Sequence, residues 1–97
     1  MRDEAGFVAI AIHHAAPEHA DAMLTFMHRV VAATEGAPGL LSFDCRREVG
    51  RGVLAGYSRW ASRADFEAAL PRITSLAPER RPEWTTQPDE VVMLELA

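Results

Sequence analysis

The residues of this chain best suited to chemistry are its histidines and a pair of adjacent arginines. The histidines are His13, His14, His19 and His28. A neutral imidazole accepts a proton near neutral pH, and a guanidinium can hold the oxygen of a phenolate or enolate. The alternative for Arg80 and Arg81 is a solvated helix end with weak ion pairs to neighbouring glutamates.

The spacing of the histidines argues against a metal site. His13 and His14 are adjacent on a predicted strand, so they point to opposite faces and cannot chelate one ion together. His19 and His28 are separated by about two and a half turns of a predicted helix and lie on opposite sides of it. Either His13 or His14 must face inward. We take His14 as the candidate general base, the alternative being a histidine at the rim of the sheet.

A predicted strand that ends on an aromatic residue and passes directly into a helix is the next feature. The β-favouring residues over 53–60 are interrupted only by Gly56, which suits a strand in which the glycine is the one exceptional position. Ser62 stands three residues before Asp65, the spacing of a capping box, so a helix is predicted to begin there. Trp60 is expected to be a core residue or the wall of a pocket.

The apolar pattern of the whole chain predicts the order β-α-β-β-α-β. The strands are predicted over residues 7–14, 40–48, 53–60 and 91–96, and the helices from Pro17 to near Thr34 and from Ser62 onward, with Pro71 kinking or ending the regular part. This is the α+β, ferredoxin-like split arrangement: a four-stranded antiparallel sheet with both helices on one face and the first and third strands central.

Alternation within the strands predicts which side chains share a face. In the second strand one face is predicted to carry Leu41, Phe43 and Cys45. In the third, Trp60 shares its face with Gly56, whereas Tyr57 faces the other way. The first strand is apolar on both faces, which is typical of a sheet covered twice. Because both helices lie on one face, we expect a second copy of the chain to cover the other.

Composition limits the class of protein. The length of 97 residues fits a single domain over 1–97. The net charge is −4 and the basic residues, all arginines, form no contiguous stripe, which argues against a nucleic-acid partner. Cys45 is the only cysteine, so a reducing compartment is compatible. The apolar run over 7–12 is too short for a signal or membrane segment. We therefore expect a cytoplasmic protein without a membrane partner.

Two short motifs resemble the antibiotic biosynthesis monooxygenase family. The passage from Trp60 through Ser62 to Phe66 matches its W-x-S-x-x-x-F motif, and residues 38–40 are similar to the PGF entry to its second strand. The resemblance extends roughly over residues 6–96. It implies a dimeric α+β barrel and a reaction without metal, haem or flavin, since a deprotonated electron-rich ring can itself reduce O₂.

The same resemblance implies a set of site residues. Trp60 corresponds to a tryptophan that lines the family's pocket, and Arg80 to an arginine that follows it. With His14, these are the predicted catalytic residues. Gly56 stands where the oxygenases carry an asparagine, and Phe66 where some carry a tyrosine. The predicted substrate-binding residues are Gly56, Phe66, Met27 and Trp84, the last as a lid or as a contact to the second subunit.

Three functions are open at this point. The leading one is a cofactor-independent monooxygenase-like enzyme acting with O₂ on an aromatic, phenolic molecule of polyketide type. Haem degradation, known from relatives with this fold, is disfavoured because no histidine follows Trp60. A non-catalytic dimeric module that binds a small aromatic molecule, or a stress-related protein, is the alternative. The residues Gly56 and Phe66, which lack the family's polar groups, favour that alternative.

Overall fold

The structure, a computed structural model, describes residues 5–97; the charged start Met1–Glu4 lies outside the described residues. The strands are β1 (Phe7–His13), β2 (Leu40–Arg47), β3 (Leu54–Trp60) and β4 (Glu90–Glu95), and the helices are η1 (Pro17–His19), α1 (Ala20–Thr34), α2 (Arg63–Thr74), η2 (Ala77–Glu79) and η3 (Pro82–Trp84). None of the described helices is long and apolar enough to cross a membrane.

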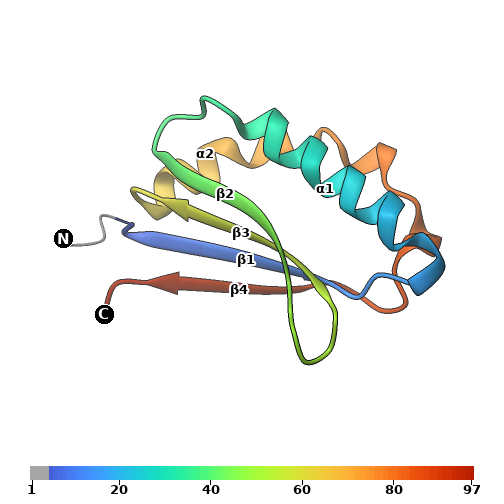
Figure 1. Ribbon diagram of the computed structural model, residues 1–97. Helices are drawn as coiled ribbons and strands as arrows, with labels where there is room; N and C mark the ends of the chain where they lie inside the picture. Colours follow the sequence, from blue (N-terminus) through green and yellow to red (C-terminus); the bar gives the residue numbers. More distant parts are fainter. Residues whose placement is uncertain (1–4) are drawn as a thin grey trace.

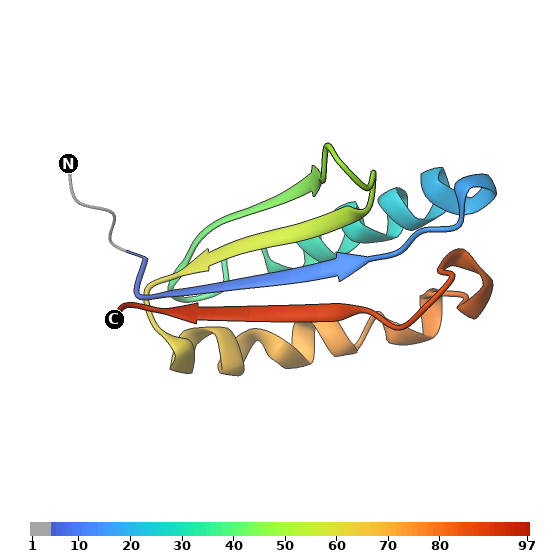
Figure 2. The same cartoon turned by 90° about the horizontal axis from the view of Figure 1, so that it is seen from below.

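The strands form one antiparallel sheet in the order β2-β3-β1-β4, with β1 and β3 central as predicted. Both α-helices lie on the same face (Figure 1), and the view in Figure 2 shows the strands in front of them, with no helix on the near side. The predicted α+β, ferredoxin-like split fold is therefore confirmed.

Two apolar clusters hold the helices on the sheet. The first consists of Phe7, Ala9, Ala37, Trp60, Phe66 and Ala69, and the second of Met23, Phe26, Met27, Val30 and Leu54. Because Phe7 pairs with Trp60 across β1 and β3, and His13 pairs with Leu54, the clusters lie toward opposite ends of the central strands. On the helix-facing side of the two central strands, the large side chains therefore sit at the ends and not at the middle.

The predicted side-chain pattern of β2 is wrong at Leu41. A register shift between Leu40 and Ser42 places Leu40 opposite Trp60, and Leu40 packs on the first cluster. Leu41 is 44% exposed. A bulge inserts one extra residue into a strand and reverses the alternation on one side of it. Beyond this point Phe43 and Cys45 pack on the second cluster, as predicted.

Helix α2 begins as predicted but does not end at Pro71. Ser62 is its N-cap: the Ser62 hydroxyl accepts a hydrogen bond from the Asp65 N–H at 3.2 Å. The helix continues through Pro71 to Thr74. A proline inside a helix removes one backbone donor and crowds the carbonyl four residues before it. The side chain of Ile73 packs on the second cluster, so tertiary contacts carry the helix past the proline.

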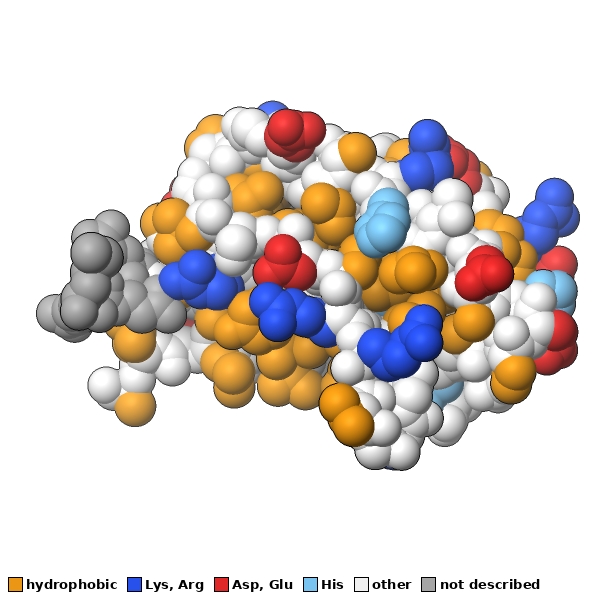
Figure 3. All heavy atoms as spheres, in the orientation of Figure 1, with side chains coloured by type: hydrophobic (Ala, Val, Ile, Leu, Met, Phe, Trp, Pro, Cys, Tyr) orange, Lys and Arg blue, Asp and Glu red, His pale blue; other side chains and the backbone are white. Residues whose placement is uncertain are grey.

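The sheet face opposite the helices is apolar at its centre. Val8, Ile10 and Ile12 of β1 are half-buried there, and Val92 and Leu94 of β4 are 39% and 51% exposed. Hydrophobic side chains gather along the lower edge of the molecule in Figure 3, on the β4 side of the sheet. No helix among residues 5–97 covers this face.

The cap at Ser62 gives a first prediction. Ser62→Ala should lower the free energy of unfolding by about 1 kcal/mol, because one N–H of the first turn of α2 loses its acceptor. Urea unfolding followed by circular dichroism measures the change. Ser75→Ala is the matched control, since the Ser75 hydroxyl donates to the Arg72 carbonyl at the other end of α2, and it should cost less than about 0.5 kcal/mol. Equal losses would contradict the capping role.

Candidate functional site

A cavity of about 430 Å³ lies between the sheet and the two helices. Its volume falls in the range of about 300–1,000 Å³ that suits a small organic ligand. The sheet contributes Ala9, Ala11, Phe43, Gly56, Ser58, Val91 and Met93, and the helices contribute Phe26, Met27, Val30, Phe66, Leu70, Ile73 and Thr74. Nearly all of these side chains are apolar, so the cavity suits an apolar molecule.

The floor of the cavity consists of small residues on the central strands. Ala9 and Ala11 of β1 lie beside Ser58 and Gly56 of β3, their respective partners in the ladder. A Cβ atom on Gly56 would lie 3.4 Å from Phe43 Cε1, so this position accepts at most a small side chain without displacing its neighbour. The absence of bulk on the floor creates the space that a ligand would occupy.

The Ser58 hydroxyl on the floor is fully engaged. It accepts a hydrogen bond from Trp60 Nε1 at 2.9 Å and donates to the Ala9 carbonyl at 3.1 Å. Ser58 is 3% exposed, which leaves its hydroxyl unavailable as the main partner of a ligand. A polar group on a ligand must therefore be met elsewhere in the cavity.

The ionisable residues that line the cavity are His13, Arg80 and Asp89. The Arg80 guanidinium holds both Asp89 oxygens, with Nη2 2.7 Å from Oδ1, and its Nη2 also reaches the Thr85 hydroxyl at 3.4 Å. His13 Nδ1 lies 3.0 Å from Asp89 Oδ1, but the two are not aligned for a hydrogen bond and the nitrogen is buried. Asp89 is thus shared between a guanidinium and an imidazole.

Burial and pairing shift the pKa values of Asp89 and Arg80 in opposite directions. Burial raises the pKa of the Asp89 carboxyl, but the hydrogen bonds from Arg80 and the proximity of the His13 imidazole together lower it more, so the pKa lies below its ordinary value. The hydrogen bond to Asp89 raises the pKa of Arg80 despite partial burial. Asp89 and Arg80 therefore remain an ion pair well into the acid range.

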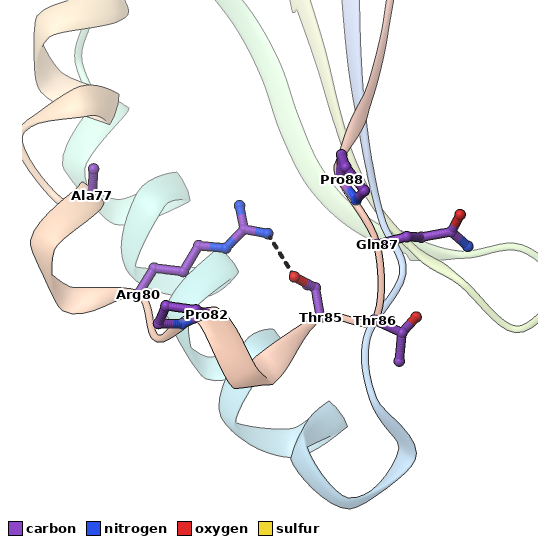
Figure 4. A pocket seen from close by; sticks show the side chains of 7 residues that line it. All are labelled: Ala77, Arg80, Pro82, Thr85, Thr86, Gln87 and Pro88. Atoms are coloured by element: carbon purple, nitrogen blue, oxygen red, sulfur yellow. Dashed lines mark hydrogen bonds between the residues drawn. The ribbon is translucent and has the colours of Figure 1, made fainter.

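Strand pairing explains why these residues meet. Ile12 is opposite Glu90 in the antiparallel ladder, so one step further along places His13 beside Asp89 on the helix face. The connector before β4 is also tied to the chain after β1, because Thr86 N–H donates to the His14 carbonyl at 2.8 Å. Figure 4 shows Arg80 extending from the turn after η2 toward this connector.

The structure corrects the choice of His14 as the inward-facing histidine. His13 lines the cavity, whereas His14 lies on the other side, against Arg51 and Gly52 of the β2–β3 turn, and pairs with Glu90. Alternation from Phe7 through Ala9 and Ala11 already places residue 13 with the buried side chains of β1. That pattern was the signal that the sequence argument did not use.

Trp60 does not line the cavity and is 0% exposed. Its ring packs edge-on to Phe66, with centroids 5.7 Å apart, inside the first cluster. The expectation that Trp60 and Arg80 line one pocket is therefore wrong for Trp60, because the side chain lies behind the wall. The competing interpretation of Trp60 as a core residue describes its position.

The remaining predicted residues divide into two groups. Gly56, Phe66 and Met27 line the cavity together with Arg80. Trp84 does not; it packs on Phe26 with ring centroids 6.2 Å apart, beside the second cluster. Arg80 also lines a shallow open pocket with Thr85, on the solvent side of the cluster (Figure 4).

Among residues 5–97 no cluster of side chains suits a metal ion. Asp89 is the site residue that the sequence argument missed entirely.

The shared carboxylate gives a second prediction, on stability. A carboxyl whose pKa is lowered by folding stabilises the fold above its unfolded pKa, and this contribution is lost as the pH falls through the folded pKa. Asp89→Asn should therefore cost about 1 kcal/mol near neutral pH. The difference from the parent should shrink as the pH falls through the lowered pKa of Asp89. Urea unfolding over a pH series measures it.

Asp44→Asn is the control for this measurement. Asp44 forms an exposed ion pair with Arg46, so its loss should stay within about 0.5 kcal/mol. A cost of Asp89→Asn that persists unchanged in acid would show that asparagine disturbs packing, and would contradict the assignment to an ion pair.

No protein-family model matches the chain, and a search of curated proteins finds no match. Solved structures do match it. The Mycobacterium tuberculosis protein Rv0793 is 20% identical with a TM-score of 0.80, covering 94% of both chains. An antibiotic biosynthesis monooxygenase is 22% identical with a TM-score of 0.76, covering 94% of this chain and 98% of that one.

The haem degrader MhuD of Mycobacterium tuberculosis, solved with two haems in its active site, is 22% identical with a TM-score of 0.73, covering 93% of this chain and 94% of that one. At these identities the similarity establishes the fold. This chain therefore has the fold shared by antibiotic biosynthesis monooxygenases and a haem degrader, with an apolar cavity that is charged at one end.

Proposed function

We propose that the chain belongs to the antibiotic biosynthesis monooxygenase family and acts, without a cofactor, as a monooxygenase on an aromatic, phenolic small molecule. The observation that carries the proposal is the cavity, whose walls are apolar while its ionisable lining residues are His13, Arg80 and Asp89. A flat apolar ring system with one acidic hydroxyl has the matching distribution of polarity. The similarity of fold to a monooxygenase supports the choice of reaction.

The chemistry needs no external reductant. In an anthrone-type phenol, loss of a proton gives an electron-rich anion that transfers electrons to O₂. The methylene carbon becomes a carbonyl that keeps one oxygen atom, and the other oxygen leaves as water with the two methylene hydrogens. The protein has to bind the ring, accept a proton and stabilise the anion, for which Arg80 is the candidate cation.

The alternative is a non-catalytic module that binds the same kind of molecule. Its support is that Arg80 is already paired with Asp89 and that Ser58 is engaged within the protein. Gly56 and Phe66 also bring no hydrogen-bonding side chain to the cavity. We do not propose haem degradation, because no histidine follows Trp60.

We further propose that the functional unit is a homodimer joined through the open sheet face. A domain of this size has little core, and the face formed by β1 and β4 offers Ile10, Val92 and Leu94 to solvent or to a partner. Large apolar sheet faces of small proteins are association surfaces. A second copy supplies a matching apolar surface by symmetry.

Oxygen uptake tests the enzymatic role of Arg80. With a panel of anthrones and naphthols, Arg80→Ala should lower kcat by about a hundredfold. It should weaken binding by less than about tenfold, because the developing anion exists mainly in the transition state. Tryptophan fluorescence measures binding. Arg81→Ala, at the adjacent exposed arginine, is the control and should keep parental turnover.

Arg80→Ala also leaves Asp89 without its partner, so the double variant Arg80→Ala/Asp89→Asn separates the two effects. Turnover that is lower in the double variant than in Asp89→Asn alone supports a direct role for the cation. Tight binding of the panel without any oxygen uptake by the parent would move the conclusion to the non-catalytic module.

Light scattering tests the dimer. The protein should scatter with twice the monomer mass of 10.7 kDa at micromolar concentration. Val92→Glu should give a monomer, because a carboxylate at the centre of an apolar interface is costly to bury. Val49→Glu, at a fully exposed position in the β2–β3 turn, is the matched control and should remain dimeric. A monomeric parent would refute the dimer.

A further inference from the structure

The ionisable groups of the cavity are gathered in one cluster. The Ser58 hydroxyl is occupied by Trp60 and Ala9, and the titratable side chains among the lining residues are His13, Arg80 and Asp89. Neither α1 nor α2 contributes a titratable group to the lining. A ligand that buries its apolar body in the cavity finds ionisable partners for its polar end at these three residues, and an unpartnered buried polar group would be costly.

His13 is the member of this cluster that can accept a proton from a ligand, since the Arg80 guanidinium only donates and Asp89 is held by Arg80. Its Nδ1 is the ring nitrogen beside Asp89, and no hydrogen bond within residues 5–97 engages its Nε2. Its side chain is only 12% exposed, so water competes weakly. The Asp89 carboxylate lies on the side of the ring where it stabilises an imidazolium formed by protonation of Nε2.

The charges of the cluster favour transfer of a proton from the ligand. With a neutral hydroxyl on the ligand and a neutral His13, the charges of Asp89 and Arg80 cancel. After the proton moves, the sequence ligand anion, imidazolium, carboxylate, guanidinium alternates in sign and still sums to zero. Neighbouring groups of opposite charge attract strongly in a partly desolvated site. The proton transfer therefore adds no net charge to the site and is favoured by these attractions.

We propose that His13 is the proton acceptor of this cavity, with Asp89 as its positioning residue, and that the ligand carries a weakly acidic phenol or enol hydroxyl at one end of an apolar body. This deepens the proposed function and rests on its ligand class. The ligand O–H bond breaks and an N–H bond forms at Nε2, while Asp89 and Arg80 keep their charges.

A dye tests the proposal without relying on turnover. A monohydroxyanthraquinone is tricyclic and changes colour when its hydroxyl ionises. Bound to the parent, it should ionise with an acid constant at least about tenfold larger than in free solution. His13→Gln and Asp89→Asn should remove most of this shift, and Asp89→Glu should restore part of it. His28→Gln and Asp21→Asn, both at exposed positions on α1, should keep the parental shift.

Circular dichroism shows whether each variant is folded, and oxygen uptake with an anthrone provides a second readout. His13→Gln should lower turnover by about a hundredfold or more and abolish its dependence on pH around neutrality. A His13-dependent colour shift without oxygen uptake by the parent would reject the oxygenase but support the proton acceptor.

Three results would overturn the inference. The first is an unchanged ionisation shift in folded His13→Gln. The second is a dye that binds the parent only as the neutral phenol, or does not bind at all. The third is oxygen uptake by His13→Gln at the parental rate and pH profile, which would leave the oxygenase standing and remove His13 from its mechanism.

Discussion

The site depends on small residues at the middle of the sheet between large ones at its ends. Phe7 and Trp60 at one end of the central strands, and Leu54 at the other, pack against the helices. Between them Ala9, Ala11 and Gly56 leave the space that the helices cannot fill. Protein interiors close most voids, so this gap persists only because the bulky ends hold helices and sheet apart.

The fold could be predicted from the sequence because its determinants are local. The cap at Ser62, the helical stripe of α1 and the alternation of β3 each specify one element, and short connections limit the topology. The errors arose where tertiary packing overrides local rules. A bulge turns Leu41 outward, and core contacts carry α2 through Pro71.

The site was less predictable because it depends on register between strands distant in sequence. Arg80 and the wall residues Met27, Gly56 and Phe66 were expected, and these do line the cavity. Asp89 was not, since its position beside His13 follows only from the pairing of β1 with β4. Trp60 was singled out by its motif but placed wrongly. A motif locates a residue along the chain, but it does not say whether the side chain lines the pocket or lies in the core behind the pocket wall.

The position of Asp89 has a consequence for the lifetime of the assembled site. Asp89 lies immediately before β4, an edge strand whose six residues are all exposed and which, among residues 5–97, pairs only with β1. Edge strands with few buried contacts open locally at a lower free energy than the core. Brief detachment of β4 would separate the carboxylate from both the imidazole and the guanidinium while the rest of the sheet stays folded. Any contact that holds β4 in place, including a partner on the open face, therefore prolongs the time during which the carboxylate stays beside the imidazole and the guanidinium.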